Sequence, residues 1–206
     1  MSAVGPNAVI RTLEALTALE GPQGARRVFE AAGLAAYVAN PPATMVPADE
    51  VAALTAALFG TLGADRARTV FWLAGRRTGD YLLANRIPGP LRYALRRLPA
   101  AFASRILLAA IARHAWTFAA DGRLTAIHGT PLRIVMEGCP LCGDARAAEP
   151  RCALYAATFE RLFGALVHAE TRVRETQCRA TGAARCTFEL DWRPRPRLAP
   201  RALVPA

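Results

Sequence analysis

Four side chains that could hold a metal ion stand in the last third of the sequence: Cys152, Glu175, Cys178 and Cys186. Thiolates and a carboxylate are ligands that a tetrahedral Zn²⁺ site uses. Cys152 opens an apolar helical stretch, where the helix dipole favours the thiolate form that binds metal. The other three residues lie on an alternating segment and its return strand. One ion would therefore join the start of a helix to a hairpin.

The spacing of these residues narrows the kind of site. They are separated by 23, 3 and 8 residues, whereas zinc ribbons and fingers use two close pairs. Residues three apart on an ideal strand point to opposite faces, so Glu175 and Cys178 can share an ion only if a bulge or a strand end intervenes. Two alternatives stay open: a reduced cross-strand pair of Cys178 and Cys186, and a site on the loop cysteines Cys139 and Cys142. Because four protein ligands leave no open position, the predicted ion is structural.

The bulk composition indicates a globular protein with a basic surface. The 206 residues are 53% hydrophobic, which is enough for one sizeable core. The formal net charge is +10, and a basic surface attracts anionic partners such as acidic lipid headgroups or carboxylate ligands. No nucleic-acid-binding motif accompanies the charge, so no nucleic-acid partner is expected. The odd number of cysteines and the lack of a signal-peptide pattern or a long apolar run predict a cytoplasmic protein.

The hydrophobic periodicity changes from helical to alternating near residue 120. Helical spacing covers 7–39, 49–62, 65–83 and 104–119, with breaks at Gly21-Pro22, Asn40-Pro41-Pro42 and Gly63. Alternation over 123–128 and 132–137, and again over 171–178 and 186–192, predicts two hairpins with one helix between them. These elements indicate an α+β fold in which N-terminal helices pack on a C-terminal antiparallel sheet.

Two features of the helical part admit more than one interpretation. Gly75 and Gly79 lie four residues apart, which favours close helix packing, the alternative being room for a flat ligand. The segment 86–105 is basic and amphipathic. Its charged face is expected to be solvated, and the alternative is contact with an anionic membrane surface.

The cysteine pattern resembles the vinyl-4-reductase domain family. The signature of that family is a helix-opening Cys, then E-x-x-C, a glycine-bearing loop and C-x-F, which correspond here to Cys152, Glu175–Cys178, Gly182 and Cys186–Phe188. Segments 31–47, 74–88, 107–119 and 159–167 are similar to the photosynthetic-pigment branch of the family, the bacteriochlorophyll 4-vinyl reductases. The resemblance covers most of residues 5–192. It implies the same α+β fold and a zinc ion on the four signature positions.

The resemblance also implies a ligand, a flat Mg-tetrapyrrole held in an apolar pocket between the helices and the sheet. The imidazole of His114 is a candidate ligand for the central Mg²⁺. Candidate pocket walls are Trp116, Phe118, Tyr155 and Phe159. The alternative for each of these side chains is a place in the packed core.

The family is named for an enzyme, yet the sequence points to no catalytic residue. It contains no Ser-His-Asp or paired-carboxylate arrangement, and no nucleotide or flavin fingerprint for a bound redox cofactor. The favoured function is therefore to bind a tetrapyrrole of the divinyl protochlorophyllide or chlorophyllide type and to carry or present it to a pathway enzyme. The alternatives are the 4(8)-vinyl reductase itself, which converts the vinyl group to ethyl, and a small-molecule sensor domain.

We expect one domain over residues 1–192, made of a helical part at 1–120 and a metal-clasped part at 121–192. The Pro- and Arg-rich tail at 193–206 is expected to be disordered. The resemblance implies a homodimer that pairs through the N-terminal helices. The protein is expected to dock on an enzyme of bacteriochlorophyll synthesis. A place at the periphery of the photosynthetic membrane remains the alternative that contact through the basic segment would give.

Overall fold

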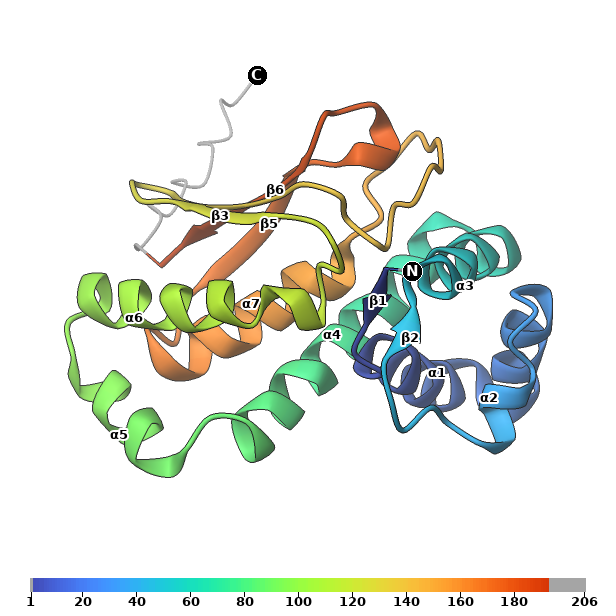
Figure 1. The fold of residues 1–206 in the computed structure, drawn as a ribbon, viewed down its shortest axis with the longest axis horizontal. Helices are drawn as coiled ribbons and strands as arrows, with labels where there is room; N and C mark the ends of the chain where they lie inside the picture. Colours follow the sequence, from blue (N-terminus) through green and yellow to red (C-terminus); the bar gives the residue numbers. More distant parts are fainter. Residues whose placement is uncertain (1, 193–206) are drawn as a thin grey trace, which may run out of the picture.

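The fold of residues 2–192 is described by a computed structural model (Figure 1). The predicted disordered tail at 193–206 lies outside the described residues. Helices dominate the first part of the chain and a four-stranded antiparallel sheet dominates the second. The α+β fold class expected from the change of hydrophobic period is thus confirmed.

The N-terminal part is a group of packed helices. It contains a short strand pair, β1 (Ala3–Val4) with β2 (Val46–Pro47), and four helices: α1 (Asn7–Ala31), α2 (Ala36–Ala39), α3 (Ala48–Leu62) and α4 (Ala64–Asn85). The break predicted at Gly21-Pro22 is a kink within α1, because Gly21 alone leaves the helical region, with φ of 72°. Gly63 ends α3 as predicted, again with positive φ.

An arm of two helices follows, α5 (Gly89–Arg97) and α6 (Ala100–Arg113), with a 3₁₀ turn at Ala115–Thr117. The helix predicted over 104–119 begins earlier, directly after Pro99, and ends at Arg113. Beyond Arg113 the chain leaves the helix, and the backbone N–H of Gly5 donates to the carbonyl oxygen of Thr117, which ties the turn to the N-terminal part. No helix of residues 2–192 is long and apolar enough to span a membrane.

The C-terminal sheet contains two hairpins that lie side by side. Its strands are β3 (Leu124–Ile127), β4 (Leu132–Met136), β5 (Arg172–Gln177) and β6 (Cys186–Asp191), in the spatial order β3-β4-β6-β5. Between the hairpins in the chain comes α7 (Ala153–Leu166). Figure 1 shows α6 and α7 on one face of the sheet, with α4 running beneath α7 toward the N-terminal helices. Buried Ile134, Phe188 and Leu190 face this helical layer.

The contact between α4 and α7 joins the two parts of the molecule, and two glycines make it close. A Cβ built on Gly75 would lie 2.2 Å from the carbonyl oxygen of Leu154 and 2.7 Å from the Cβ of Ala157. A Cβ on Gly79 would lie 2.7 Å from the Cβ of Arg161. The spacing of Gly75 and Gly79 therefore serves helix packing, and no room for a flat ligand remains at these positions.

Candidate functional site

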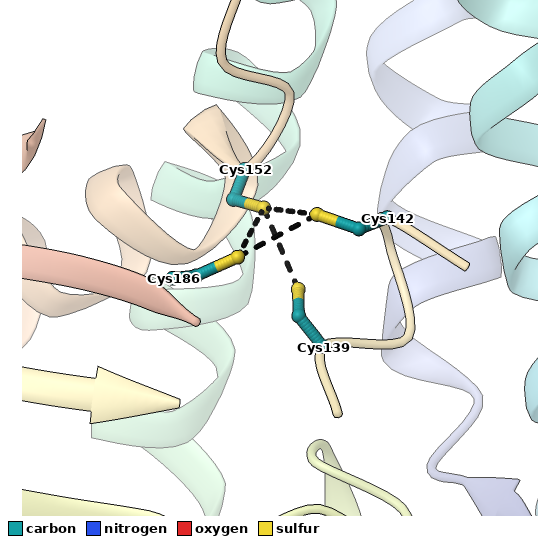
Figure 2. Close-up of side chains that lie close together, drawn as sticks. All are labelled: Cys139, Cys142, Cys152 and Cys186. Carbon is teal, nitrogen blue, oxygen red and sulfur yellow. Dashed lines mark hydrogen bonds between the residues drawn. The ribbon is translucent and has the colours of Figure 1, made fainter. Parts of the chain in front are cut away.

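All five cysteines of the chain meet at the end of the sheet that faces the N-terminal helices. Each of them is buried and reduced. Cys139 and Cys142 come from the loop after β4, Cys152 is the N-cap of α7, and Cys186 is the first residue of β6, as Figure 2 shows for these four. Cys178 lies just after β5. The convergence of a helix start and a hairpin was predicted, whereas the approach of the loop was only an alternative.

The sulfur atoms are spaced as a single metal ion would require. Six sulfur–sulfur contacts within the cluster measure from 3.3 to 4.0 Å. Tetrahedral Zn²⁺ with Zn–S bonds of about 2.3 Å places its sulfur ligands about 3.8 Å apart. The backbone N–H of Arg179 donates to Cys186 Sγ at 3.4 Å, a contact that stabilises a metal-bound thiolate. The donor set therefore fits a tetrahedral divalent ion.

A bulge in β5 brings Glu175 to the same cluster. Glu175 pairs with Phe188 and Gln177 with Thr187, so two residues of β5 advance against one of β6. This register shift, which the sequence required for a shared site, turns both Glu175 and Cys178 toward Cys152. The donor atoms of the four predicted ligands, Cys152, Glu175, Cys178 and Cys186, all lie within 4.8 Å of one another. A second set with the same property is formed by Cys139, Cys142, Cys152 and Cys186.

The carboxylate of Glu175 is only half satisfied by the protein. Its Oε2 accepts a hydrogen bond from the backbone N–H of Cys152 at 2.9 Å, which caps the start of α7. Its Oε1 is buried and has no hydrogen-bond partner among the described residues. Burial and, next, the charge of Cys178 raise the pKa of this carboxyl to about 9. Without a cation nearby, the carboxyl therefore keeps its proton at neutral pH.

The buried thiols also shift one another's pKa values. Hydrogen bonds with Cys139 and then Cys152 lower the pKa of Cys142. Hydrogen bonds with Cys139 and then Cys142 raise the pKa of Cys152. Some thiolates are thus stabilised by neighbours that keep their protons, because the five thiols cannot all ionise together in a buried site. A divalent ion would displace these protons and compensate the charge.

The residues predicted to hold a tetrapyrrole are divided between the surface and the core. His114 and Trp116 are exposed at the end of α6, and Trp116 keeps 61% of its surface accessible. The Nδ1 atom of His114 lies 2.8 Å from the carbonyl oxygen of Ala110. A carbonyl can only accept, so Nδ1 carries the proton and Nε2 of the neutral imidazole is left with its lone pair.

Phe118, Tyr155 and Phe159 instead pack together between α7 and the sheet. Their ring centroids lie 6.0 to 6.5 Å apart, and Phe188 of β6 completes the group. Burial raises the pKa of Tyr155, and its hydroxyl donates to the carbonyl oxygen of Phe118 at 2.6 Å. These three side chains therefore contribute to the core in this structure. Whether any of them also contacts a ligand stays a prediction.

Two surface hollows lie on the other side of the sheet. A hollow of about 560 Å³ is lined by Glu137, Gln177 and Arg185 near the β5–β6 turn. A second, of about 370 Å³, is lined by Ile127, Val135 and other residues on the outer sheet face. Both lack the apolar enclosure that would bury a large flat ligand.

Comparison with known proteins gives sequence matches over part and over nearly all of the chain. Residues 132–191 match the V4R domain. The bacteriochlorophyll synthase 23 kDa chain of Cereibacter sphaeroides is 40% identical over 187 residues, which are 91% of this chain and 89% of that protein. The chain of the same description from Rhodobacter capsulatus is also 40% identical, over 91% of this chain and 86% of that protein.

Solved structures share the fold at low sequence identity. An H-NOX protein from K. algicida, described as Fe(II) unliganded, superposes with a TM-score of 0.56 over 98% of this chain and all of that one, at 10% identity. The phenol-responsive sensory domain of the transcription activator PoxR, solved with phenol, gives 0.51 over 70% of this chain and 74% of that one, at 20% identity. At these identities the likeness concerns the fold.

Proposed function

The chain belongs to the family of the bacteriochlorophyll synthase 23 kDa chains, and we propose from this membership that it binds a Mg-tetrapyrrole intermediate of bacteriochlorophyll synthesis and presents it to a pathway enzyme. The observation that carries a role in this pathway is 40% identity over 91% of the chain to two such chains. The ligand would be of the divinyl protochlorophyllide or chlorophyllide type. The carrier role is the finer part of the proposal, and it rests on the side chains at the end of α6.

The exposed face at the end of α6 has the chemistry that such a ligand needs. With Nδ1 engaged by the carbonyl oxygen of Ala110, the Nε2 atom of His114 would be the one to bind the Mg²⁺. Trp116, two residues further along the chain, offers a flat, exposed ring, and Ile106 exposes apolar surface on the helix itself. Arg105 and Arg113 on the same helix are exposed and would meet the carboxylates of the tetrapyrrole through charge-assisted hydrogen bonds.

A titration with divinyl chlorophyllide, with and without NADPH, tests the proposal. We expect the Soret band to shift on addition of the protein, with no vinyl-to-ethyl product in either mixture. His114→Ala and Trp116→Ala should each weaken binding by about tenfold, a loss of about 1.4 kcal/mol. The control is His128→Ala, which removes an exposed histidine from the β3–β4 turn. Equal binding by all three variants would remove the α6 face as the site.

The same mixtures decide between carriage and the reductase alternative. Conversion of the 8-vinyl group to ethyl needs two electrons and two protons, which NADPH and water would supply. Formation of an ethyl product with NADPH would show that the protein is the reductase and that the carrier proposal is wrong. An unshifted Soret band at micromolar protein would contradict tetrapyrrole binding in either role.

We propose in addition that the cysteine cluster holds one structural Zn²⁺. Cys152, Cys178 and Cys186 are the predicted ligands that supply thiols, and Glu175 is the predicted fourth ligand. The ion would tie the start of α7 to both strands of the last hairpin. A site with four protein ligands keeps no position for substrate, so its contribution is to folding. Elemental analysis of the purified protein should give one zinc per chain, and its absence would contradict the clasp.

We also propose a homodimer that pairs through the N-terminal helices, on the basis of the family resemblance. Residues 2–85 expose only one large hydrophobic side chain, Met45, by more than a third, so this interface would consist of polar and half-buried side chains. Light scattering at micromolar concentration should give about twice the chain mass of 22.1 kDa. A species of 22.1 kDa would contradict the dimer.

A further inference from the structure

The loop after β4 brings one more thiol into contact with three of the predicted ligands. Cys142 Sγ lies 3.3 Å from the sulfur of Cys152, 3.6 Å from that of Cys178 and 3.5 Å from that of Cys186. Cys152 Sγ in turn lies 4.0 Å from Cys178 and 3.7 Å from Cys186. All five distances are near the edge of about 3.8 Å that four thiolates adopt around one Zn²⁺. The sulfur atoms of Cys178 and Cys186 lie within 4.8 Å of each other, so Cys142 occupies a fourth corner beside the other three thiols.

We propose that Cys142, rather than Glu175, is the fourth ligand of the ion, which is then held by thiolates alone. This inference rests on the metal clasp proposed above and changes its ligand set. Glu175 has a separate structural task, because its Oε2 accepts the backbone N–H of Cys152 and so fixes the start of α7. It is a positioning residue for Cys152. The set that contains Glu175 is the competing assignment.

Cys139 lies next to this tetrad, within 4.8 Å of Cys142, Cys152 and Cys186. Its sulfur is 3.4 Å from Cys152 Sγ, and Figure 2 shows this contact, with Cys139 near the start of the loop. As a neighbouring thiol it donates a hydrogen bond to the bound thiolate of Cys152, the type of contact that orients metal ligands. The alternative, in which Cys139 replaces Cys178 as ligand, is one of the outcomes of the test.

Ligation by Cys142 would connect the ion to the N-terminal helices as well as to the hairpin. A Cβ on Gly143, the next residue, would lie 3.0 Å from the Cβ of Ala52 on α3. Further along the loop, Glu149 forms an ion pair with Arg68 of α4 at 2.6 Å. The loop therefore packs on α3 and α4 while the ion fastens it to α7 and the sheet. With Glu175 as ligand, the ion would leave the loop unfastened.

Cobalt substitution counts the thiolates without any change to the chain. The intensity of the sulfur-to-cobalt charge-transfer band increases with the number of bound thiolates. The wild-type protein and Glu175→Gln, whose amide oxygen still accepts the N–H of Cys152, should give the same four-thiolate intensity. A band one quarter weaker in the wild type would indicate three thiolates and a carboxylate, and would overturn the proposal.

Single serine variants then show which cysteines bind the ion. Cys142→Ser should lose stoichiometric zinc, whereas Cys139→Ser and Glu175→Gln should retain it. Hydrogen exchange in the loop 138–151 should rise in Cys142→Ser and in chelated wild type to the same extent. Zinc retained by Cys142→Ser but lost by Glu175→Gln would establish the carboxylate set instead. Zinc lost by Cys139→Ser but kept by Cys178→Ser would move the site onto the loop and overturn the tetrad.

The two proposals fail in different ways. A wild-type protein purified without metal, and unable to take up zinc or cobalt, would contradict the clasp itself. A wild-type protein with one zinc per chain that Cys142→Ser also retains would leave the clasp intact and refute only the role of Cys142. If Cys142→Ser does not fold, the cobalt spectrum of the wild type still decides the number of thiolates.

Discussion

At the scale of single residues, removal of the Tyr155 hydroxyl tests whether this side chain belongs to the core or to a ligand pocket. It donates to the carbonyl oxygen of Phe118 at 2.6 Å within the aromatic group of α7 and the sheet. Tyr155→Phe should lower the free energy of unfolding by about 1–2 kcal/mol, because the partly buried carbonyl of Phe118 loses its donor. The affinity for tetrapyrrole should stay unchanged. Urea denaturation measures the first effect, and Tyr93→Phe, at an exposed ring, should change stability by less than about 0.5 kcal/mol.

The residues of the candidate metal centre were predictable only where local chain geometry places them. Cys152 stands at a helix start, and Cys178 and Cys186 flank the turn of one hairpin, so their meeting follows from the element pattern. The sequence also showed that Glu175 and Cys178 could share an ion only with a bulge or a strand end between them, and the structure has a bulge there. The approach of Cys142 could not be predicted, because contacts far away in sequence direct its loop. The backbone N–H of Ala147, for example, donates to the carbonyl oxygen of Ala180.

At the scale of elements, the close contact of α4 and α7 reverses the usual effect of a glycine in a helix. Gly75→Ala should destabilise the protein by about 1–3 kcal/mol, because the new methyl group meets the backbone of Leu154 and α7 must shift. The matched control is Gly60→Ala on α3, where nothing lies within 4 Å of the added Cβ. That substitution should stabilise the helix by up to about 1 kcal/mol. Chemical denaturation measures the change in the free energy of unfolding for both variants. Equal changes would contradict this account of the contact.

The elements themselves followed closely from hydrophobic period, and the deviations have tertiary causes. Both hairpins and the helix between them lie where alternation and helical spacing predicted them. The apolar face of the amphipathic segment 86–105 is less buried than its pattern suggests, since Leu95 is covered and Phe102 remains 59% exposed. A periodic pattern shows which face is apolar, but it does not show what covers that face.

At the scale of the whole molecule, positive charge is concentrated on the arm. Between Asp80 and Asp121 the chain contains no acidic residue, yet it carries six arginines. None of the ion pairs among the described residues involves an arginine of this segment. Exposed Tyr93, Phe102 and Trp116 lie among them. Aromatic side chains between arginines are typical of segments that lie on an anionic membrane surface.

We therefore predict that the protein binds vesicles with anionic lipids and that binding weakens as salt is added, because the attraction is screened. Arg97→Ala combined with Arg105→Ala should reduce the partition coefficient by about tenfold or more, at about 1 kcal/mol for each arginine near the surface. Arg26→Ala combined with Arg27→Ala removes the same charge from exposed positions of α1 and should have little effect. Sedimentation with anionic and neutral vesicles measures all three proteins. An equal loss in both double variants would attribute binding to net charge alone and contradict a membrane-facing arm.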